Sequence, residues 1–349
     1  MHDLDCSKTY LSLDPTGLRD RLRDLPRQCE IGWRKARAVA LPENWKFPDK
    51  VVICGMGGSA IAGDLVADLA SMQPTVPILV VRDFCLPFVV DQRSLVIVCS
   101  YSGNTEETLS MFHQALDANA QILVVTVGGL LADEAGVRGV PLLTIDIPGE
   151  PRSAVAHTLL LLLGTLGRLG LVETTEDDVR AATQASRQQV CNLGEEVPTG
   201  DNPAKQLALE LKDKVILIYG GGIFSGIARR WKTQFNENAK AWAFFETMPE
   251  LLHNSVEAYG ASPKISQHVT ALLLQPNIGS DQVRDRYQIV AKLLRHCGLS
   301  HHVLEGQKGP HLVQMLAMLL LGDYVSYYLA MLNGVDPSST PTIVLAKQR

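Results

Sequence analysis

The chain of 349 residues has no excess of basic side chains, since 32 Lys and Arg stand against 37 Asp and Glu for a formal net charge of −5. Proteins that grip nucleic acid need a net or strongly clustered positive surface, so a nucleic-acid partner is not expected. Extensive disorder is excluded as well, because 46% hydrophobic and 20% charged residues are close to globular averages. A small-molecule partner is the expectation.

The sequence also lacks an uninterrupted apolar run of the roughly 20 residues that a membrane-spanning helix needs. Its two most apolar windows, residues 155–171 and 312–332, contain charged or polar side chains and are expected to be buried helices. Residues 1–10 carry acidic side chains where a signal peptide needs a basic and then an apolar stretch. The seven cysteines show no CxxC spacing, and an odd number cannot all pair within the chain. We therefore expect a cytoplasmic protein with reduced thiols and no membrane partner.

Short apolar runs alternate with longer helical patterns along most of the chain, which predicts an α/β protein built on parallel sheets. The runs are rich in β-branched residues and suit strands that are buried on both faces. In the first half, strands are expected at 51–54, 78–81, 95–98, 122–125 and 142–145, with helices at 61–71, 105–116, 130–137 and 155–171. The second half repeats the pattern, with strands at 215–219, 269–274 and 302–304 and helices at 225–241, 282–297 and 310–332. We interpret this repeated pattern as two related halves of the chain.

A glycine turn links the first expected strand to the first expected helix. Gly57 and Gly58 leave the backbone open to a ligand oxygen, and Ser59 adds a hydroxyl where the helix begins. The unpaired amides of a helix start favour an anion. Read as GxGxxA, the turn also fits a dinucleotide, with Asp83 near the end of the next strand as a ribose ligand. Glycines that merely turn the chain are the structural alternative.

A second loop, rich in hydroxyl groups, follows the strand expected at 95–98. Ser100, Ser102 and Thr105 surround a glycine there, and together they suggest a neutral cradle for a phosphate monoester. The structural alternative is a helix cap, in which Asn104 or Thr105 pairs with a side chain one turn later. Because open α/β sheets bind ligands at the carboxyl ends of their strands, we expect both loops to bind phosphate.

These loops and two later segments resemble a known superfamily. SYSGNTEET at 100–108 resembles the phosphosugar-binding loop of sugar isomerase (SIS) domains, and GMGGSAIAGD at 55–64 is similar to the matching first loop. RWKTQFNENAK at 230–240 and PELLHN at 249–254 are similar to motifs of the bifunctional phosphoglucose/phosphomannose isomerases of archaea and bacteria. The resemblance runs over residues 50–347 and includes the order of the motifs.

The resemblance implies a fold and an activity. Two SIS-type subdomains are expected, at 49–172 and 173–349, each a flavodoxin-like three-layer sandwich. Residues 1–48, which are rich in charged side chains, are expected from their composition to form a helical lead-in. The implied enzyme is a homodimer without metal or cofactor that converts glucose 6-phosphate, and mannose 6-phosphate with it, to fructose 6-phosphate. Such a reaction would belong to glycolysis and gluconeogenesis.

Isomerisation of a sugar phosphate moves a proton between C1 and C2 through an enediolate, so it needs a carboxylate base and a cation near the developing oxyanion. Glu237, among amide and apolar neighbours, is the expected base, and the resemblance places the family's catalytic glutamate in this NEN motif. A surface pair with Lys240 is its structural alternative. Arg152 follows the strand at 142–145 and matches the arginine that stabilises the enediolate; neutralising Glu150 is its alternative role.

Ring opening needs a further acid/base group, and imidazole titrates near neutrality. The resemblance implies that His253 has this role and reaches the site of the neighbouring subunit. It also implies that Lys347 helps to open the ring, although a solvated tail is the alternative. Thr340 matches the threonine that allows both C2 epimers to react. One departure is Ser255, where the family usually has glutamate, and this leaves room for a shifted substrate range.

Five other hypotheses are weaker. A zinc site would draw on a histidine-rich region whose spacing fits no tetrahedral pattern, namely His296, Cys297, His301, His302 and His311. Lys308 is read as part of a turn, not as the family lysine. A non-catalytic sugar-phosphate sensor would usually carry a basic DNA-binding segment, which residues 1–48 do not resemble. A nicotinamide dehydrogenase would leave the loop at 100–108 unexplained, and an aminotransferring isomerase would need a glutaminase domain before the first subdomain.

Overall fold

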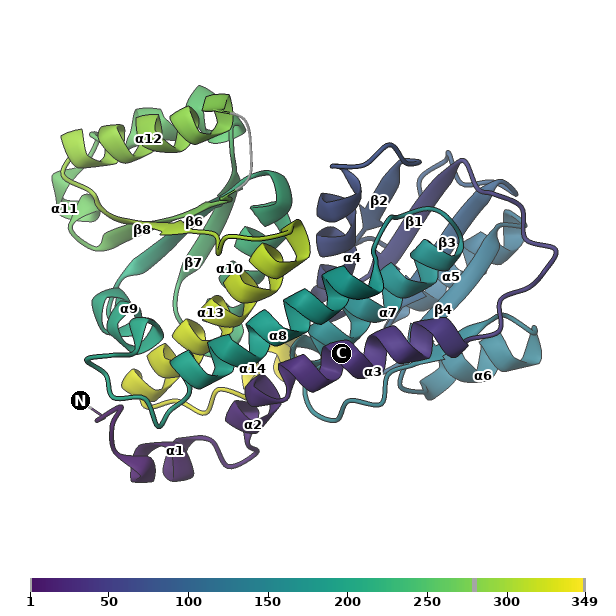
Figure 1. Cartoon of the computed structure of the whole chain (residues 1–349), viewed down its shortest axis with the longest axis horizontal. Coiled ribbons are helices and arrows are strands. Elements are labelled where there is room, and N and C mark those ends of the chain that lie inside the picture. Colours follow the sequence, from purple (N-terminus) through teal and green to yellow (C-terminus); the bar gives the residue numbers. More distant parts are fainter. Residues whose placement is uncertain (1, 278–280, 348–349) are drawn as a thin grey trace. The chain divides into compact units, whose positions relative to one another are not determined.

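The computed structural model describes residues 2–277 and 281–347 (Figure 1). The chain divides into two compact units that do not follow the order of the sequence. The β1–β5 unit is Leu25–Arg180, and the β6–β9 unit combines Met1–Asp24 with Ala181–Arg349. Since these units are defined by contacts in space, the expected limits at residues 48 and 172 along the chain stay a prediction.

The described residues of the β1–β5 unit form a five-stranded parallel sheet in the order β2-β1-β3-β4-β5. This is the 2-1-3-4-5 order of flavodoxin-like folds. The strands are β1 (Lys50–Gly55), β2 (Ile78–Val81), β3 (Ser94–Cys99), β4 (Gln121–Thr126) and β5 (Leu142–Thr144). The helices are α3 (Leu25–Ala38), α4 (Gly57–Ala70), α5 (Glu106–Asp117), α6 (Gly129–Val137) and α7 (Val155–Arg168), with the 3-10 turn η1 (Pro151–Ala154).

Helices cover both faces of this sheet because its strands are apolar on both faces. Val52 and Cys54 pack with Phe112 of α5 and Leu131 of α6 in one core cluster. Successive strand residues point to opposite faces, so the intervening Ile53 lies on the other face, where α4 packs on β1 and β2 and contacts α7. Helix α3 packs on α7 (Figure 1). The result is the predicted three-layer arrangement of a parallel sheet.

The β6–β9 unit repeats the plan. Its described residues form a four-stranded parallel sheet in the order β7-β6-β8-β9, which matches the order β2-β1-β3-β4 of the other unit. The strands are β6 (Val215–Gly220), β7 (Ala243–Thr247), β8 (Val269–Gln275) and β9 (Ser300–Glu305). The helices that flank them are α10 (Ser225–Glu237), α12 (Asp281–His296) and α13 (His311–Leu332), and the short turns are η2 (Gly222–Phe224), η3 (Glu250–His253), η4 (Ser255–Ala258) and α11 (Pro263–Ser266). Two related parallel sheets confirm the predicted fold class.

Helix α12 covers one face of the second sheet, and α10 and α13 lie on the other (Figure 1). Tyr287 and Leu294 of α12 pack on Ala271 and Leu273 of β8. By length and composition α13 is the one helix in the described part of the chain that is apolar enough to cross a membrane, yet 94% of its most apolar window is buried inside the protein. The structure thus confirms the expected buried helix at 312–332.

Segments from the N-terminus and from the middle of the chain pack on α13. Helix α1 (Ser7–Leu13) and helix α2 (Leu18–Arg23) contact it, and so does α9 (Pro203–Leu211). The remaining helices are α8 (Glu176–Leu193) and α14 (Pro341–Lys347). The buried Lys205 of α9 ties the N-terminal segment down, because its Nζ donates to the carbonyl of Leu4 at 2.7 Å and to the carboxylate of Asp5 at 2.9 Å.

The sequence pattern missed β7 and extended α10 too far. Helix α10 ends at Glu237, four residues before the expected end, because Lys240 adopts a positive φ of 55° that turns the chain into β7. Strand β7 is an edge strand, and its Phe244 stacks on the exposed Trp242. It therefore lacks the continuous buried run by which the other strands were identified.

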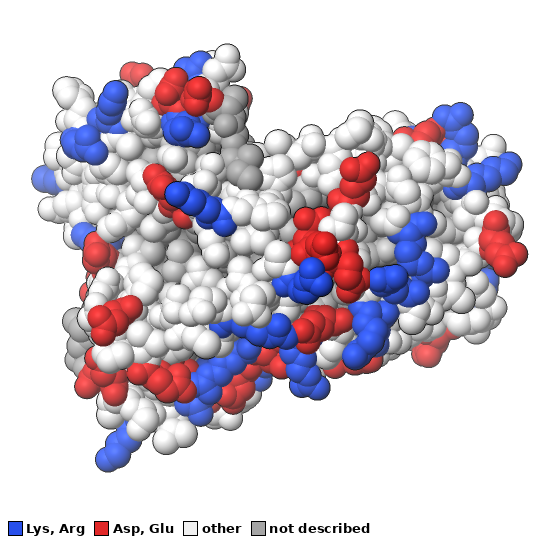
Figure 2. Space-filling view, viewed as in Figure 1, with Lys and Arg blue, Asp and Glu red and all other residues white. Residues whose placement is uncertain are grey.

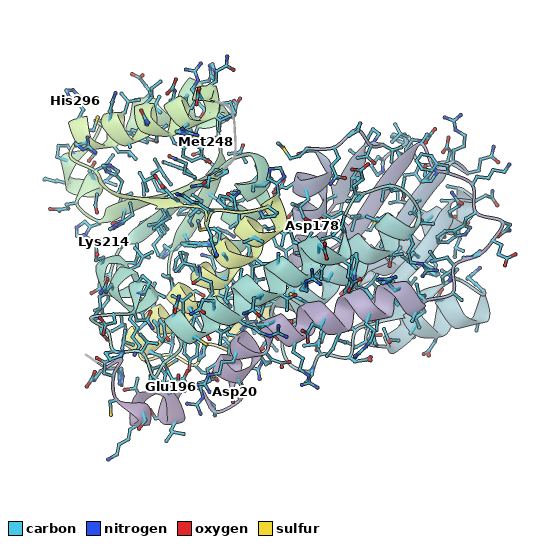
Figure 3. All side chains as sticks on the ribbon, in the orientation of Figure 1. Asp20, Asp178, Glu196, Lys214, Met248 and His296 are labelled. Atoms are coloured by element: carbon cyan, nitrogen blue, oxygen red, sulfur yellow. The ribbon has the colours of Figure 1, made fainter. Side chains whose placement is uncertain are left out.

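Charged side chains of both signs are interspersed on the face drawn in Figure 2, and its described residues show no broad area of one sign. Many of them pair locally. Arg23 of α2, for example, donates to Glu195 at 2.6 Å and also contacts Glu196, which Figure 3 labels beside α1 and α2. Ion pairs at the protein surface contribute little stability individually.

His157 on α7 makes the stability of the β1–β5 unit depend on pH. Its side chain is fully buried, and neither ring nitrogen has a hydrogen-bond partner among the described residues. Burial lowers the pKa of His157 to about 4, with Lys35 acting in the same direction and Asp146 opposing it. The unfolded chain therefore binds more protons than the native protein between pH 6.5 and pH 4, and the free energy of unfolding falls as pH drops through this window.

We expect about 3 kcal/mol of stability to be lost between pH 6.5 and pH 4 through this group, on the scale of 1.36 kcal/mol per pKa unit. His157→Leu should flatten the pH dependence of urea unfolding over that range. The half-exposed His113 of α5 offers a control, since His113→Gln should keep the slope. An unchanged slope in His157→Leu would show that the buried imidazole does not control the acid sensitivity.

Candidate active site

The first glycine turn lies at the carboxyl end of β1. Gly57 has a positive φ of 48° and begins α4, whose 14 residues leave the first amides without partners inside the helix. The Ser59 hydroxyl accepts a hydrogen bond from the backbone N–H of Tyr101 at 3.0 Å. A hydroxyl that accepts one bond keeps its own proton to donate. The turn and the second loop are therefore joined through Ser59, which can still donate to a ligand.

The second loop, between β3 and α5, is held rigidly. Ser100 is buried, its hydroxyl donates to the Thr105 hydroxyl at 3.2 Å, and it accepts from the N–H of Gly103 at 3.2 Å. Ser102 is exposed, and its hydroxyl accepts from the N–H of Asn104 at 3.3 Å. Thr105 is the N-cap residue of α5, but its side chain makes no capping hydrogen bond. The helix-cap alternative is therefore not favoured, and the Thr105 proton is directed elsewhere.

A third loop, which sequence reasoning missed, supports the second. Gly103 has a φ of 70°, and a Cβ atom there would lie 1.8 Å from the carbonyl oxygen of Gly128 at the end of β4. The amide oxygen of Asn104 accepts from the N–H of Leu130 at 3.0 Å. The sequence signal that could have revealed this loop is the Gly128-Gly129 pair shortly after the strand expected at 122–125. Glycines at such a position allow a loop to approach a neighbouring backbone closely.

Arg152 lies beside the first turn. It is 4% exposed and belongs to η1, which follows β5. Gly58 packs directly on the backbone of this turn, because a Cβ atom on Gly58 would lie 2.8 Å from the nitrogen and 3.0 Å from the Cα of Arg152. The close approach places a buried arginine next to the start of α4, so the carboxyl ends of β1, β3 and β5 together present hydroxyls, free amides and a cation.

Gly58→Ala should lower kcat/KM, because the added methyl group forces the Arg152 backbone away from α4. A displacement near 1 Å in a catalytic site can cost about 10²-fold in rate, so we expect a loss of about 10-fold to 10²-fold. The measurement is steady-state kinetics with sugar phosphates.

Gly136→Ala on α6 is the matched control, since a Cβ atom there meets nothing within 4 Å, and it should keep full activity. If Gly58→Ala kept the wild-type kcat/KM, the contact between α4 and η1 would not be needed to position Arg152.

The dinucleotide alternative loses support in this unit. Asp83 is exposed, and its carboxylate accepts from the N–H of Phe84 at 2.6 Å, so it caps a local turn. Burial raises the pKa of the Cys99 thiol to about 12 and that of the Cys54 thiol further, which keeps both thiols protonated and unreactive. Neither a ribose ligand nor a cysteine nucleophile is indicated here.

Glu237 is the last residue of α10 and is partly buried. The helix is anchored on α13, because Asn238 donates to the Ser326 hydroxyl at 3.0 Å and Asn333 donates to the carbonyl of Ala239 at 2.9 Å. The Nζ of Lys240 donates to the backbone carbonyl of Glu237 at 2.7 Å. The expected Lys240 neighbour is therefore present, and it binds the main chain at this point.

The same lysine also binds the segment that contains Thr340. The Nζ of Lys240 also donates at 2.7 Å to the carbonyl of Ser339, the residue before Thr340. Thr340 precedes α14, whose first turn it closes by accepting from the N–H of Ile343 at 3.1 Å. The structure thus brings the Thr340 segment to the end of the helix that carries Glu237.

His253 and Glu237 lie at opposite ends of the same strand, β7. Glu237 precedes β7, whereas His253 follows it in η3, and the intervening strand has five residues. Strands rise about 3.3 Å per residue, so the strand alone separates its two ends by roughly 15 Å. His253 is exposed, and its imidazole has no hydrogen bond or ion pair among the described residues. One subunit does not bring this imidazole to its own Glu237.

Ser255, the departure from the family pattern, has a defined contact. Its hydroxyl donates to the carboxylate of Glu246 on β7, and its N–H donates to the Asn254 side chain at 2.6 Å. Asn254 in turn donates to Glu250 at 3.1 Å. The segment around His253 is therefore fixed to β7 by a carboxylate that the sequence pattern did not single out.

Lys347 is the last residue of α14 and is exposed, as is the whole of that helix. Its role therefore stays a prediction. The histidine-rich region is dispersed: His296 ends α12 (Figure 3), His301 bonds the carbonyl of Leu299 at 3.0 Å, and His302 lies 3.2 Å from Glu210. Within residues 2–277 and 281–347, no group of three or more His, Cys, Asp or Glu side chains is arranged to hold a metal ion.

Comparison with known proteins gives the relatives of this chain. Residues 200–349 match the family model described as the bacterial phospho-glucose isomerase C-terminal SIS domain. The chain is 33% identical over 327 residues to a bifunctional phosphoglucose/phosphomannose isomerase from Caldicellulosiruptor bescii, covering 93% of this chain and 96% of that protein. It is 32% identical over 299 residues to a protein of the same name from Aquifex aeolicus, covering 85% of this chain and 89% of that protein.

The fold is similar to that of a solved protein. The crystal structure of a glucose-6-phosphate isomerase like protein from Thermus thermophilus superposes with a TM-score of 0.65, covering 100% of this chain and 99% of that one. Sequence identity is 23%, so this likeness concerns the fold alone.

Proposed function

Because the chain belongs to the bifunctional phosphoglucose/phosphomannose isomerase family, we propose that it is an aldose–ketose isomerase. It interconverts glucose 6-phosphate and mannose 6-phosphate with fructose 6-phosphate, and it needs neither metal nor cofactor, because a general base and fixed charges suffice for an enediolate. The observation that carries the proposal is that hydrogen bonds hold the loops after β1 and β3 together and in a fixed shape. In the same chain, helix α10 ends within the NEN motif.

The phosphate of the substrate binds to the loops of the β1–β5 unit. Its oxygens accept from the amides of Gly57 and Gly58 at the start of α4, where the helix dipole favours an anion. Further hydrogen bonds to the phosphate come from four hydroxyl groups, those of Ser59, Ser100, Ser102 and Thr105. Ser59 and Thr105 fit this role best, since each already accepts one hydrogen bond within the loops and retains its proton.

Proton transfer and ring opening are assigned to four ionisable side chains and one threonine. Glu237 removes the proton from C2 of the aldose and returns it to C1, while the guanidinium of Arg152 stabilises the negative charge of the enediolate. Lys347 and His253 assist the ring-opening step. Thr340 leaves space for rotation about C2–C3, so that both C2 epimers reach the same enediolate.

The active enzyme is a homodimer in which His253 serves the neighbouring subunit. Two observations support this part of the proposal: His253 is exposed without a partner among the described residues, and β7 separates it from Glu237 of the same chain. We assign this reaction to glycolysis and gluconeogenesis, and the enzyme to the cytoplasm.

The test is a coupled assay of fructose 6-phosphate formation from each substrate in the presence of EDTA. Turnover of both sugar phosphates supports the proposal. Binding of either sugar phosphate without turnover would overturn it in favour of a non-catalytic sensor, and turnover that EDTA abolishes would contradict the metal-free reaction.

A further inference from the structure

The ammonium group of Lys240 is surrounded by backbone carbonyls. Its Nζ donates to the carbonyls of Glu237, Asp336 and Ser339, each at 2.7 Å, and lies 3.3 Å from the carbonyl of Asn238. An ammonium has three protons in tetrahedral directions, so three short bonds use its full donor capacity. A lysine with three short carbonyl partners from two segments of the chain acts as a connector between them.

The two connected segments are the ones to which the proposed function assigns the base and the epimer-selecting threonine. Glu237 and Asn238 end α10, where the last carbonyls have no partner in the helix and the dipole favours a cation. Asp336 and Ser339 belong to the segment that follows α13 and leads directly to Thr340. The positive φ of Lys240 turns its side chain back over the helix end.

We infer that Lys240 is a positioning residue that sets Glu237 and Thr340 relative to each other and thereby sets the preference between glucose 6-phosphate and mannose 6-phosphate. This inference rests on the proposed function. Lys240 acts through the backbone of its neighbours, so it does not need to touch substrate.

Loss of this ammonium should not unfold the protein, because other contacts hold each segment. Asn238 and Asn333 still anchor the end of α10 on α13. Ser338 is bound at 2.6 Å by Thr16 and at 3.1 Å by Arg21. What is lost is the link between the two segments, so a change in their relative position, and not a loss of fold, is the expected consequence.

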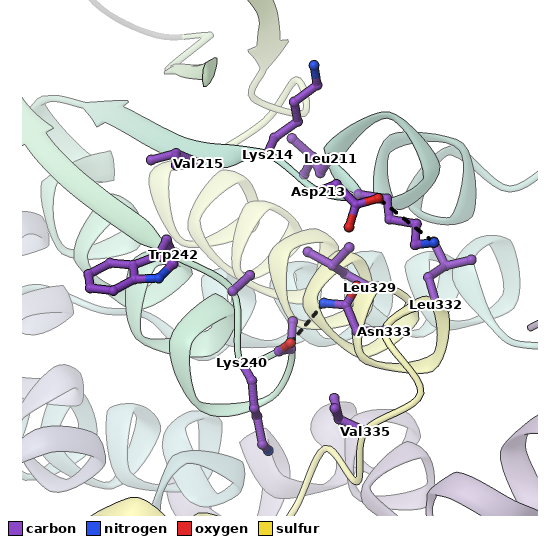
Figure 4. Close-up of a pocket in the computed structure, with 13 residues that line it drawn as sticks. Leu211, Asp213, Lys214, Val215, Lys240, Trp242, Leu329, Leu332, Asn333 and Val335 are labelled. Atoms are coloured by element: carbon purple, nitrogen blue, oxygen red, sulfur yellow. Dashed lines mark hydrogen bonds and ion pairs between the residues drawn. The ribbon is translucent and has the colours of Figure 1, made fainter. Parts of the chain in front are cut away.

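An open pocket next to Lys240 gives experimental access to this cluster of carbonyl groups. It has a volume of about 640 Å³ and lies at the amino ends of β6 and β7, with Lys214, Trp242 and Val335 on its walls (Figure 4). The stem of Lys240 lines this pocket, and its amine is directed away from Trp242. In Lys240→Ala the space of the stem becomes a route by which a small alkylammonium can reach the carbonyls.

The first experiment compares Lys240→Met with Lys214→Met, which removes a lysine that donates to a single carbonyl, that of Gln267 at 2.8 Å. We expect Lys240→Met to lower kcat by up to about 10²-fold, the cost of a small misplacement of a catalytic group, with KM nearly unchanged. The ratio of kcat/KM for mannose 6-phosphate to that for glucose 6-phosphate should shift as well. Lys214→Met should change neither quantity. Equal losses for both substrates, or no loss, would overturn the inference.

The second experiment is chemical rescue of Lys240→Ala. Propylammonium should restore part of kcat and of the wild-type substrate ratio, whereas tetramethylammonium, which has no N–H donor, should not. Equal rescue by both ions would show that charge alone matters and would overturn the positioning role.

Hydrogen exchange separates this inference from the proposed function. Amides of residues 234–241 and 340–344 should exchange faster in Lys240→Met, while those of β8 should not change. If wild-type protein is inactive on both sugar phosphates but exchange still rises in both segments, the link stands and the proposed function fails. If Lys240→Met changes neither hydrogen exchange nor kinetics, the inference about Lys240 fails and the proposed function is unaffected.

Discussion

Glu237→Gln should lower kcat by about 10²-fold to 10⁴-fold with either sugar phosphate, which is the usual contribution of a positioned general base. Glutamine keeps the size of the side chain but cannot accept the C2 proton. The bond from Lys240 to the backbone carbonyl of residue 237 and the anchors of α10 on α13 remain in the variant, so it should fold normally. KM should change little, because the proposed phosphate ligands are other residues, in the loops after β1 and β3.

Asp285→Asn, an exposed acid of α12, is the matched control for the lost negative charge and should be fully active. Mixed dimers extend the test to the subunit arrangement. Glu237→Gln and His253→Ala homodimers should each be poorly active, but refolding them together creates dimers in which one site retains both groups, so activity should reappear. Absence of such complementation would place His253 in its own subunit's site or outside the reaction.

Asp323→Leu should destabilise the β6–β9 unit by about 3–5 kcal/mol, the usual cost of breaking a buried ion pair. Arg230 of α10 donates to Asp323 of α13 through two parallel bonds of 3.1 and 2.7 Å, and the two side chains are only 1% and 2% exposed. Without the carboxylate, the guanidinium charge would remain in the core opposite an apolar side chain. Urea unfolding, followed by circular dichroism, measures the effect.

The double variant Arg230→Met with Asp323→Leu should recover much of the lost stability, because well-packed apolar side chains often replace a buried pair without cost. Arg284→Met, which removes an exposed arginine 3.8 Å from Asp281, should leave the unfolding midpoint unchanged. A double variant as unstable as the sum of the two single variants would show that the two residues do not act as a pair.

The positions of the two loops proposed to bind phosphate were predictable because they follow from local patterns. Each glycine turn stands directly after a buried strand, and strands of a parallel sheet present their carboxyl ends at one edge, so Ser59 and Ser100 were expected together. The structure joins them through Tyr101. The NEN motif was recognisable in the same way, although its position at the end of α10 was not, because the pattern extended that helix to residue 241.

The partners of the catalytic candidates were not predictable. Lys240 was considered only as an ion-pair partner of Glu237, since helical spacing reports neighbours three and four residues apart. Its bonds to Asp336 and Ser339 join positions almost a hundred residues apart. Strand β7 escaped detection because an edge strand with exposed aromatic residues has no buried run to reveal it.

The sequence by itself determined the α/β class, the order along the chain of the strands other than β7, the position of the two loops after β1 and β3, and the family. These depend on local hydrophobic periodicity and on short motifs, which are written in consecutive residues. Only the tertiary structure decided that Gly58 packs on the Arg152 turn, that Glu237 and His253 lie at opposite ends of β7, and that Lys240 links α10 to the Thr340 segment. Such contacts arise when distant segments bury their apolar faces against one another, and no local pattern encodes which backbone groups then meet.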